Sequence, residues 1–191
     1  MAITKPPGLL TYEAYLAERE VNRRYHIIDG VRIFMAAPTW RHQRIQFNIN
    51  QSLHRFEEDG GIGLALGAPL DILIRRDSLR TRQPDVFYIS NERLAIAGGV
   101  PEKGVLEIAP ELAVEIISDT ERRRDIDEKI ADYIAIGVKE CWLVWPETQT
   151  VEVLLLTPEG AERVATYDDT QTLQSMTFRH LTVAVAEFFK P

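Results

Sequence analysis

Residues 112–145 constrain the fold of this chain more than any other part of the sequence. They begin with a nearly continuous apolar run over 112–117, as expected for a central strand that is covered on both faces. A helical segment over 122–136 follows and ends at Gly137, and a second strand is expected over 140–145. A helix between two neighbouring strands predicts a right-handed parallel crossover. We therefore predict an α/β domain with a mixed central sheet that is flanked by helices.

A hairpin and a long helix are predicted before this unit. The Asp29-Gly30 pair favours a tight turn between strands over 25–28 and 31–34, because both residues tolerate a positive φ. A helix is predicted to open at Pro38-Thr39 and to end at Gly60-Gly61, and its apolar residues fall on one face. The residues expected on this buried face are Ile45, Ile49, Ser52, Leu53 and Phe56.

The remaining elements are short. They are a helix over 11–21 capped by Thr11, strands over 64–66, 70–74 and 85–89, two or three meander strands around Glu159-Gly160, and a helix over 183–189. Residues 91–110 contain Gly and Pro and predict a surface loop with at most one helical turn.

Composition limits the classes of function. A chain of 191 residues that is 45% hydrophobic predicts one domain over 1–191 with its own core. The single cysteine, Cys141, excludes a disulfide framework, and His26, His42, His54 and His180 lack the spacing of zinc ligands. No apolar run reaches 18 residues and no signal peptide is recognisable, so we expect a cytoplasmic protein that does not span a membrane.

Glu115 is the most informative single residue. Strand alternation places Ala113, Glu115 and Ile117 on one face of an otherwise apolar strand. A carboxylate in such surroundings is costly unless it is paired, hydrogen-bonded or bound to a cation. The pattern therefore leaves two alternatives, a salt bridge to a nearby basic residue or a functional site.

Two further residues accompany it. Pro84 suits the start of a strand, so Asp85 is expected at the mouth of one, where turn chemistry is the alternative explanation. On a helical wheel, Lys129 borders the apolar stripe that faces the sheet. It is expected either to pair with Asp125 one turn earlier or to serve the same site as Glu115.

Asp85, Glu115 and Lys129 in this order resemble the PD-(D/E)XK nuclease superfamily. The chain is more narrowly similar to the bacterial Uma-type restriction endonuclease family, over about residues 11–190. The segments that carry the resemblance are Tyr25–Gly30, the helix with His42, Pro84-Asp85, Glu115–Ser118, Asp125–Lys129, Tyr133, Gly137 and Trp142–Val144. The resemblance implies a restriction-endonuclease-like core with antiparallel hairpins.

The resemblance also implies a catalytic site. Asp85, Glu115 and the main-chain carbonyl of Ile116 would hold a divalent cation, Mg²⁺ or in its place Mn²⁺, through hard oxygen ligands. Lys129 would orient the attacking water or neutralise charge on the phosphate. His42, Asp125 and Tyr133 are secondary site candidates, and a histidine satisfied within the core is the alternative for His42.

The sequence departs from the pattern of these families at several positions. The superfamily lysine two residues after the glutamate is Ile117 here, so Lys129 takes that role by position. The glutamate that the family usually has in the hairpin is His26. The family's Tyr-Trp and Val-Asp-Pro segments read Cys141-Trp142 and Val144-Trp145-Pro146.

These observations predict a Mg²⁺-dependent DNA endonuclease. The alternatives are a catalytically decayed module that binds DNA or a protein, favoured by His26 and the acidic pI of about 5.2, and a phosphodiesterase for a small or RNA substrate. A homodimer is expected, with the first helix and residues 183–189 as interface segments. Three clusters of arginines are predicted either to contact the phosphate backbone or to lie in solvated loops. They are Arg75-Arg76, Arg80-Arg82 and Arg122-Arg123-Arg124.

Overall fold

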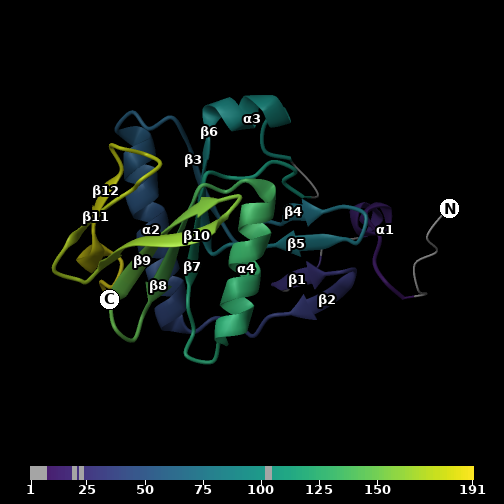
Figure 1. Ribbon diagram of the computed structural model, residues 1–191, viewed down its shortest axis with the longest axis horizontal. Coiled ribbons are helices and arrows are strands. Elements are labelled where there is room, and N and C mark those ends of the chain that lie inside the picture. The colour runs from purple at the N-terminus through teal and green to yellow at the C-terminus, as the bar shows by residue number, and fades with distance from the viewer. Residues whose placement is uncertain (1–7, 19–20, 22–23, 102–104) are drawn as a thin grey trace.

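A six-stranded mixed sheet runs through the computed structural model, which describes residues 8–18, 21, 24–101 and 105–191 (Figure 1). Its strand order is β10-β9-β8-β7-β6-β3. In chain order the strands are β3 (Gly63–Gly67), β6 (Val86–Ser90), β7 (Leu112–Ile116), β8 (Glu140–Trp145), β9 (Thr150–Thr157) and β10 (Gly160–Tyr167). The β7–β8 pair is parallel and the other pairs are antiparallel, which confirms the predicted parallel unit and the mixed sheet.

One long helix covers each face of this sheet. The helix α2 (Trp40–Glu58) packs through Ile45, Ile49 and Leu53 against the face that carries Val114 and Ile116. The helix α4 (Arg123–Ile136) lies on the opposite face, and its residues are buried against Ala113, Ile117 and Cys141. The two faces of β7 therefore belong to two separate apolar clusters, as the alternation of the apolar run predicts.

The ends of these helices follow the local signals in the sequence. Thr39 accepts a hydrogen bond from the backbone N–H of His42 and so caps α2. Gly137 ends α4 with a φ of 86°, a conformation that favours glycine. The predicted bounds of both helices are confirmed to within two residues.

A second, four-stranded sheet lies beside the first, in the order β2-β1-β5-β4. Its strands are β1 (Tyr25–Ile28), β2 (Val31–Phe34), β4 (Ile72–Arg75) and β5 (Arg80–Arg82). Asp29 and Gly30 have φ values of 51° and 81°, which confirms the tight turn of the β1–β2 hairpin. Tyr25 and Ile27 lie in a small apolar cluster with Tyr12 and Tyr15 of α1 (Tyr12–Ala17), the short helix that Thr11 caps.

Three predictions about the elements were wrong. Residues 91–110 include a helix of seven residues, α3 (Asn91–Ala97), because Ser90 caps its first turn and Gly98 ends it in the left-handed conformation. The segment 80–82 is the strand β5, and its arginines are buried. The chain ends in the hairpin β11 (Thr172–Gln174) and β12 (Thr182–Ala184), followed by a short 3₁₀ turn, η1 (Val185–Glu187), in place of the helix predicted over 183–189.

The segments predicted to form a dimer interface pack within the chain itself. Tyr12 and Tyr15 are buried in the cluster beneath the four-stranded sheet, and Val183, Val185 and Phe188 are buried against α2 and the six-stranded sheet. Their apolar character is therefore explained without a second copy. Among the described residues, no helix is long and apolar enough to cross a membrane.

One edge of the six-stranded sheet is irregular. The strand β10 pairs only with β9, and its register shifts between Arg163 and Ala165. Glu162 and Arg163 are exposed on this strand. A bulge of this kind bends the strand and interrupts its ladder of hydrogen bonds.

Candidate active site

Asp85 lies immediately before β6 and is almost completely buried. Its Oδ1 accepts hydrogen bonds from Nη1 of Arg24 at 2.6 Å and from Nε2 of His42 at 3.0 Å. Its Oδ2 accepts from the backbone N–H of Ile116 at 2.7 Å. Burial alone would raise the pKa of Asp85, but the bond from His42, the charge of Arg24 and the Ile116 N–H hold it down at about 2. Asp85 is therefore an ionised carboxylate at neutral pH.

Glu115 lies on β7, on the face that α4 covers, and only 2% of its surface is exposed. Its Oε2 accepts a hydrogen bond from Nζ of Lys129 at 2.8 Å, and its Oε1 accepts one from the hydroxyl of Tyr133. Burial raises the pKa of Glu115 above its ordinary value, and the nearby charge of Asp85 adds to this effect against the attraction of Lys129. The two carboxylates therefore lie close enough to influence each other's ionisation.

Lys129 connects Glu115 to a third carboxylate. Its Nζ lies 2.7 Å from Oε1 of Glu121, in the segment between β7 and α4. Burial disfavours the charged ammonium, but Glu115 and Glu121 together raise the pKa of Lys129 above its ordinary value. Because Lys129 and Tyr133 are four residues apart on α4, both side chains reach the same carboxylate. The ammonium is therefore a fixed positive charge of the site.

Asp125 does not belong to this cluster. The alternative in which it pairs with Lys129 is wrong, because Lys129 points into the protein toward Glu115 and Glu121. The side chain of Asp125 is 45% exposed, and its nearest cation is Arg124 at 3.8 Å. An i,i+4 spacing permits a pair on the helix surface, but two buried carboxylates compete more strongly for the ammonium.

The structure thus brings together five predicted side chains and one predicted backbone position. The side chains are Asp85, Glu115, Lys129, His42 and Tyr133, and the backbone position is Ile116. Sequence reasoning missed Arg24, which also donates from Nη2 to the carbonyl of Gln83 at 2.9 Å. Only its place just before the first predicted strand could have drawn attention to it.

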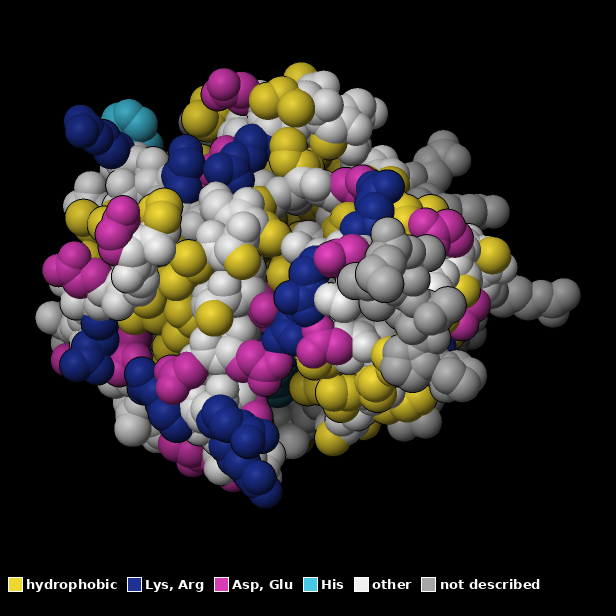
Figure 2. Space-filling view, turned by 45° about the vertical axis from the view of Figure 1, so that its right-hand side comes forward, with side chains coloured by type: hydrophobic (Ala, Val, Ile, Leu, Met, Phe, Trp, Pro, Cys, Tyr) yellow, Lys and Arg dark blue, Asp and Glu magenta, His cyan; other side chains and the backbone are white. Residues whose placement is uncertain are grey.

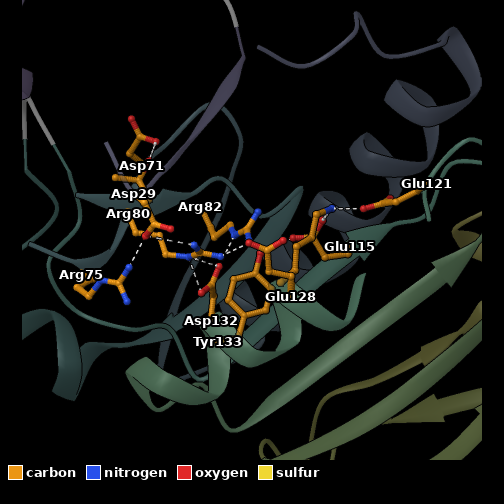
Figure 3. Close-up of polar contacts among 12 residues, drawn as sticks. Asp29, Asp71, Arg75, Arg80, Arg82, Glu115, Glu121, Glu128, Asp132 and Tyr133 are labelled. Carbon is orange, nitrogen blue, oxygen red and sulfur yellow. Dashed lines mark hydrogen bonds and ion pairs between the residues drawn. The ribbon is translucent and has the colours of Figure 1, made fainter. Parts of the chain in front are cut away.

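Two arginines predicted to contact the phosphate backbone, or else solvent, are instead buried in an ion-pair network (Figure 3). Nε of Arg80 lies 2.7 Å from Oδ1 of Asp132, and Nε of Arg82 lies 2.6 Å from Oδ2 of the same carboxylate. Glu128, one turn earlier on α4, contacts both guanidinium groups. The network joins β5 to the same helix that carries Lys129 and is therefore part of the scaffold of the site.

The other predicted arginine clusters remain on the surface. Arg122, Arg123 and Arg124 are exposed at the start of α4, where Arg123 pairs with Asp127 at 3.0 Å. Arg75 and Arg76 are also exposed. Figure 2 shows basic and acidic side chains interspersed over one face of the molecule. On this face, a polyanion would therefore contact individual arginines and not a continuous basic patch.

The donor set of the site can be compared with the needs of a divalent cation. Among the residues that the structure describes, no three His, Cys, Asp or Glu side chains form a ready metal site. Asp85 and Glu115 offer hard carboxylate oxygens from neighbouring strands, and Asp85 is bonded to the backbone of Ile116. Mg²⁺ retains several waters and is commonly bound by one or two carboxylates. The two carboxylates are therefore the hard oxygen donors that this site offers to a divalent cation such as Mg²⁺.

The low pKa of Asp85 predicts a pH dependence of stability. Because folding lowers this pKa from 3.8 to about 2, the ionised group stabilises the fold above about pH 4, and this contribution is lost as the pH falls toward 2. We expect the difference in unfolding free energy between the wild type and Asp85→Asn to shrink by about 2 kcal/mol over this window. Urea unfolding at several pH values measures it, and a constant difference would contradict the assignment.

Comparisons with known proteins agree with this architecture. The family Uma2, described as "putative restriction endonuclease", matches residues 10–186. A solved structure described as a putative nuclease belonging to DUF820, from Anabaena variabilis, superposes with a TM-score of 0.74 at 20% sequence identity. The alignment covers 94% of this chain and 97% of that chain, and at this identity it establishes the fold. No curated protein matches the chain.

Proposed function

The chain belongs to the Uma2 family of putative restriction endonucleases, and from this premise we propose that it is a divalent-metal-dependent endonuclease that hydrolyses phosphodiester bonds in DNA. One observation carries the proposal. Asp85 and Glu115 are buried on neighbouring strands, and Lys129 donates directly to Glu115. Two carboxylates beside a fixed ammonium match the requirements of phosphodiester hydrolysis, in which charge accumulates on the phosphate.

Asp85, Glu115 and the carbonyl of Ile116 are the proposed ligands of Mg²⁺, which Mn²⁺ can replace. A divalent ion, when bound, polarises the phosphate and lowers the pKa of a coordinated water. Arg24 and His42 keep Asp85 ionised and fixed in orientation through their hydrogen bonds to Oδ1. These two residues therefore prepare the carboxylate for metal binding.

Lys129 acts as a cation rather than as a base in this proposal. Its raised pKa keeps the ammonium protonated at neutral pH, so it can donate a hydrogen bond but cannot accept a proton. From its position on Glu115 it can orient the attacking water or neutralise charge on the phosphate. Tyr133 holds the other oxygen of Glu115 and so fixes the rotamer of this carboxylate.

Cleavage of plasmid DNA tests the proposal directly. We expect nicking or linearisation by the wild type with Mg²⁺ or Mn²⁺, and none after chelation. Asp85→Asn and Glu115→Gln are expected to be inactive, while Asp127→Asn, an exposed position on α4, is expected to cleave at the wild-type rate. If the wild type cleaves no DNA with either ion, the enzymatic proposal is wrong.

Metal binding is a separate prediction. We expect Asp85→Asn and Glu115→Gln each to abolish Mn²⁺ binding measured by calorimetry, because each variant removes one of the two proposed carboxylate ligands. Alanine variants at these positions are expected to be less stable in the metal-free protein, since truncation leaves Arg24 or Lys129 without its partner. Intact Mn²⁺ binding in both amide variants would place the site elsewhere.

A second candidate function is a decayed nuclease module that binds DNA or a protein partner. His26 favours it, because the family resemblance leads one to expect a carboxylate at this place in the hairpin. Retention of DNA in a gel-shift assay without cleavage by any metal would support this alternative. We also propose that the protein forms a homodimer and is cytoplasmic, and that an RNA or a small phosphodiester is the alternative substrate.

A further inference from the structure

One face of the four-stranded sheet points toward the candidate active site. Ile27 of β1 pairs with Thr81 of β5, so their antiparallel neighbours His26 and Arg82 lie opposite each other. The hydroxyl of Thr81 donates a hydrogen bond to Asp71 on the opposite face of this sheet, the far face. Alternation along the strands therefore places His26 and Arg82 on the face toward the candidate site, the near face, together with Arg24 two residues earlier in the chain than His26.

Several polar atoms on this near face are buried without a hydrogen bond. His26 is only 4% exposed, and within the described part of the chain neither of its ring nitrogens makes a hydrogen bond. Nε of Arg24 is likewise buried without a hydrogen-bond partner among those residues, and Nη2 of Arg82 makes no hydrogen bond but lies 3.4 Å from Oε1 of Glu128. Most buried polar groups in folded proteins are satisfied, so such a concentration requires an explanation.

The charges around His26 are mainly positive. The pKa of His26 is lowered to about 3, chiefly by burial and then by the nearby charges of Arg82, Lys129 and Arg24, while Asp85 opposes them. The imidazole is therefore neutral and keeps one N–H donor. Arg24 and Lys129 are the same residues that contact Asp85 and Glu115, so the unpartnered atoms adjoin the proposed catalytic carboxylates.

We propose that Arg24, His26 and Arg82 form a phosphate-binding recess beside Asp85 and Glu115. Nε of Arg24, Nη2 of Arg82 and the N–H of His26 would donate to the non-bridging oxygens of one phosphate of the substrate. The inference rests on the proposed nuclease function, because it assigns a place to the phosphate of that substrate. The Arg24 side chain is 19% exposed, so a phosphate would reach this recess from the side of Arg24.

The chemistry of the donors favours an anion over a metal ion. Guanidinium groups have no lone pair and cannot ligate a cation. A cation at His26 would also face the positive charges of Arg24 and Arg82, whereas a phosphate would be attracted by both. Where the family pattern has a carboxylate, this chain therefore has a neutral imidazole, which donates a hydrogen bond and adds no negative charge.

Binding of inorganic phosphate to the metal-free protein tests the recess. We expect saturable binding at constant ionic strength, with a change in the ¹⁵N resonances of the His26 ring and none at the exposed His54. His26→Phe is expected to weaken phosphate binding about tenfold or more, as for loss of a charge-assisted hydrogen bond. His26→Gln, which retains a donor, should recover most of the affinity, and His54→Gln is the matched control.

Two results would overturn the recess. One is phosphate binding that leaves the His26 resonances unchanged and is equally strong in His26→Phe and His26→Gln. The other is a shift of these resonances by Mg²⁺ alone in phosphate-free buffer, with loss of Mg²⁺ binding in His26→Phe, which would make the imidazole a metal ligand.

The two proposals can fail separately. If phosphate binds at His26 but the protein cleaves no DNA, the nuclease proposal fails and the recess is supported. If the wild type cleaves DNA and His26→Phe cleaves it with unchanged KM and kcat, the recess is refuted and the nuclease proposal is supported.

Discussion

Replacing Asp132 with alanine is expected to lower the free energy of unfolding by about 3–5 kcal/mol, the usual cost of removing one partner of a buried ion pair. The effect is large because one carboxylate serves two guanidinium groups, with Nε of Arg80 at 2.7 Å and Nε of Arg82 at 2.6 Å. Asp132 is 8% exposed, and both arginines are buried. Truncation would therefore leave two positive charges within the protein that Glu128, at its edge, only partly neutralises.

Urea unfolding monitored by circular dichroism measures this cost. Asp127→Ala is the matched control, because Asp127 is on the same helix and makes only an exposed pair with Arg123. We expect the control to change stability by less than about 0.5 kcal/mol. Equal stabilities of the two variants would show that the network contributes nothing to the attachment of α4 to β5.

Replacing Lys129 with methionine is expected to reduce the rate of cleavage by a factor of about 10² to 10³. Methionine retains much of the apolar stem of lysine but removes the ammonium that contacts Glu115 and Glu121. The position two residues after Glu115 is Ile117, which is buried against α4, so the strand provides no other lysine. Single-turnover cleavage of a defined duplex, with saturating Mn²⁺, measures the chemical step.

The same change also removes the partner of a buried carboxylate, so it is expected to destabilise the fold. Activity must therefore be compared well below the melting temperature, with Lys139→Met as the control at an exposed lysine. The double variant Lys129→Met/Glu121→Gln removes one of the two carboxylates left without their cation and is expected to recover stability without activity. A wild-type rate in Lys129→Met would show that the lysine is structural and would reduce the site to two carboxylates and a metal.

The parts of the fold that could be predicted are those with a strong local signal. The apolar run of β7, the periodicity of α2 and the Asp29-Gly30 turn each determine their own structure, and all three are confirmed. The strand β5 was missed because a three-residue segment with two arginines is typical of a solvated loop. The burial of Arg82 in this strand depends on Asp132, fifty residues later in the sequence. No local sequence pattern predicts a partner at that distance.

The residues of the candidate site likewise divide into those with a local signal in the sequence and those whose role depends on distant contacts. Glu115 was identified because a carboxylate within an apolar strand requires an explanation. Asp85 was identified because it follows Pro84 at the start of a strand and, together with Glu115 and Lys129, resembles the nuclease pattern. Asp125 was included because the segment Asp125–Lys129 carries the family resemblance, although such a segment does not show which of its side chains face the site. Arg24 was missed because its role depends on a contact with Asp85 across two sheets.

The irregular edge strand β10 restricts how two copies of this chain can associate. A regular edge offers a free row of backbone donors and acceptors, and sheets of two molecules can then join into one continuous sheet. The register shift between Arg163 and Ala165 interrupts that row, and exposed Glu162 and Arg163 add charges that a neighbouring strand would have to accommodate. Association by strand addition at β10 is therefore disfavoured. A dimer of this chain is accordingly expected to form through a surface other than the β10 edge.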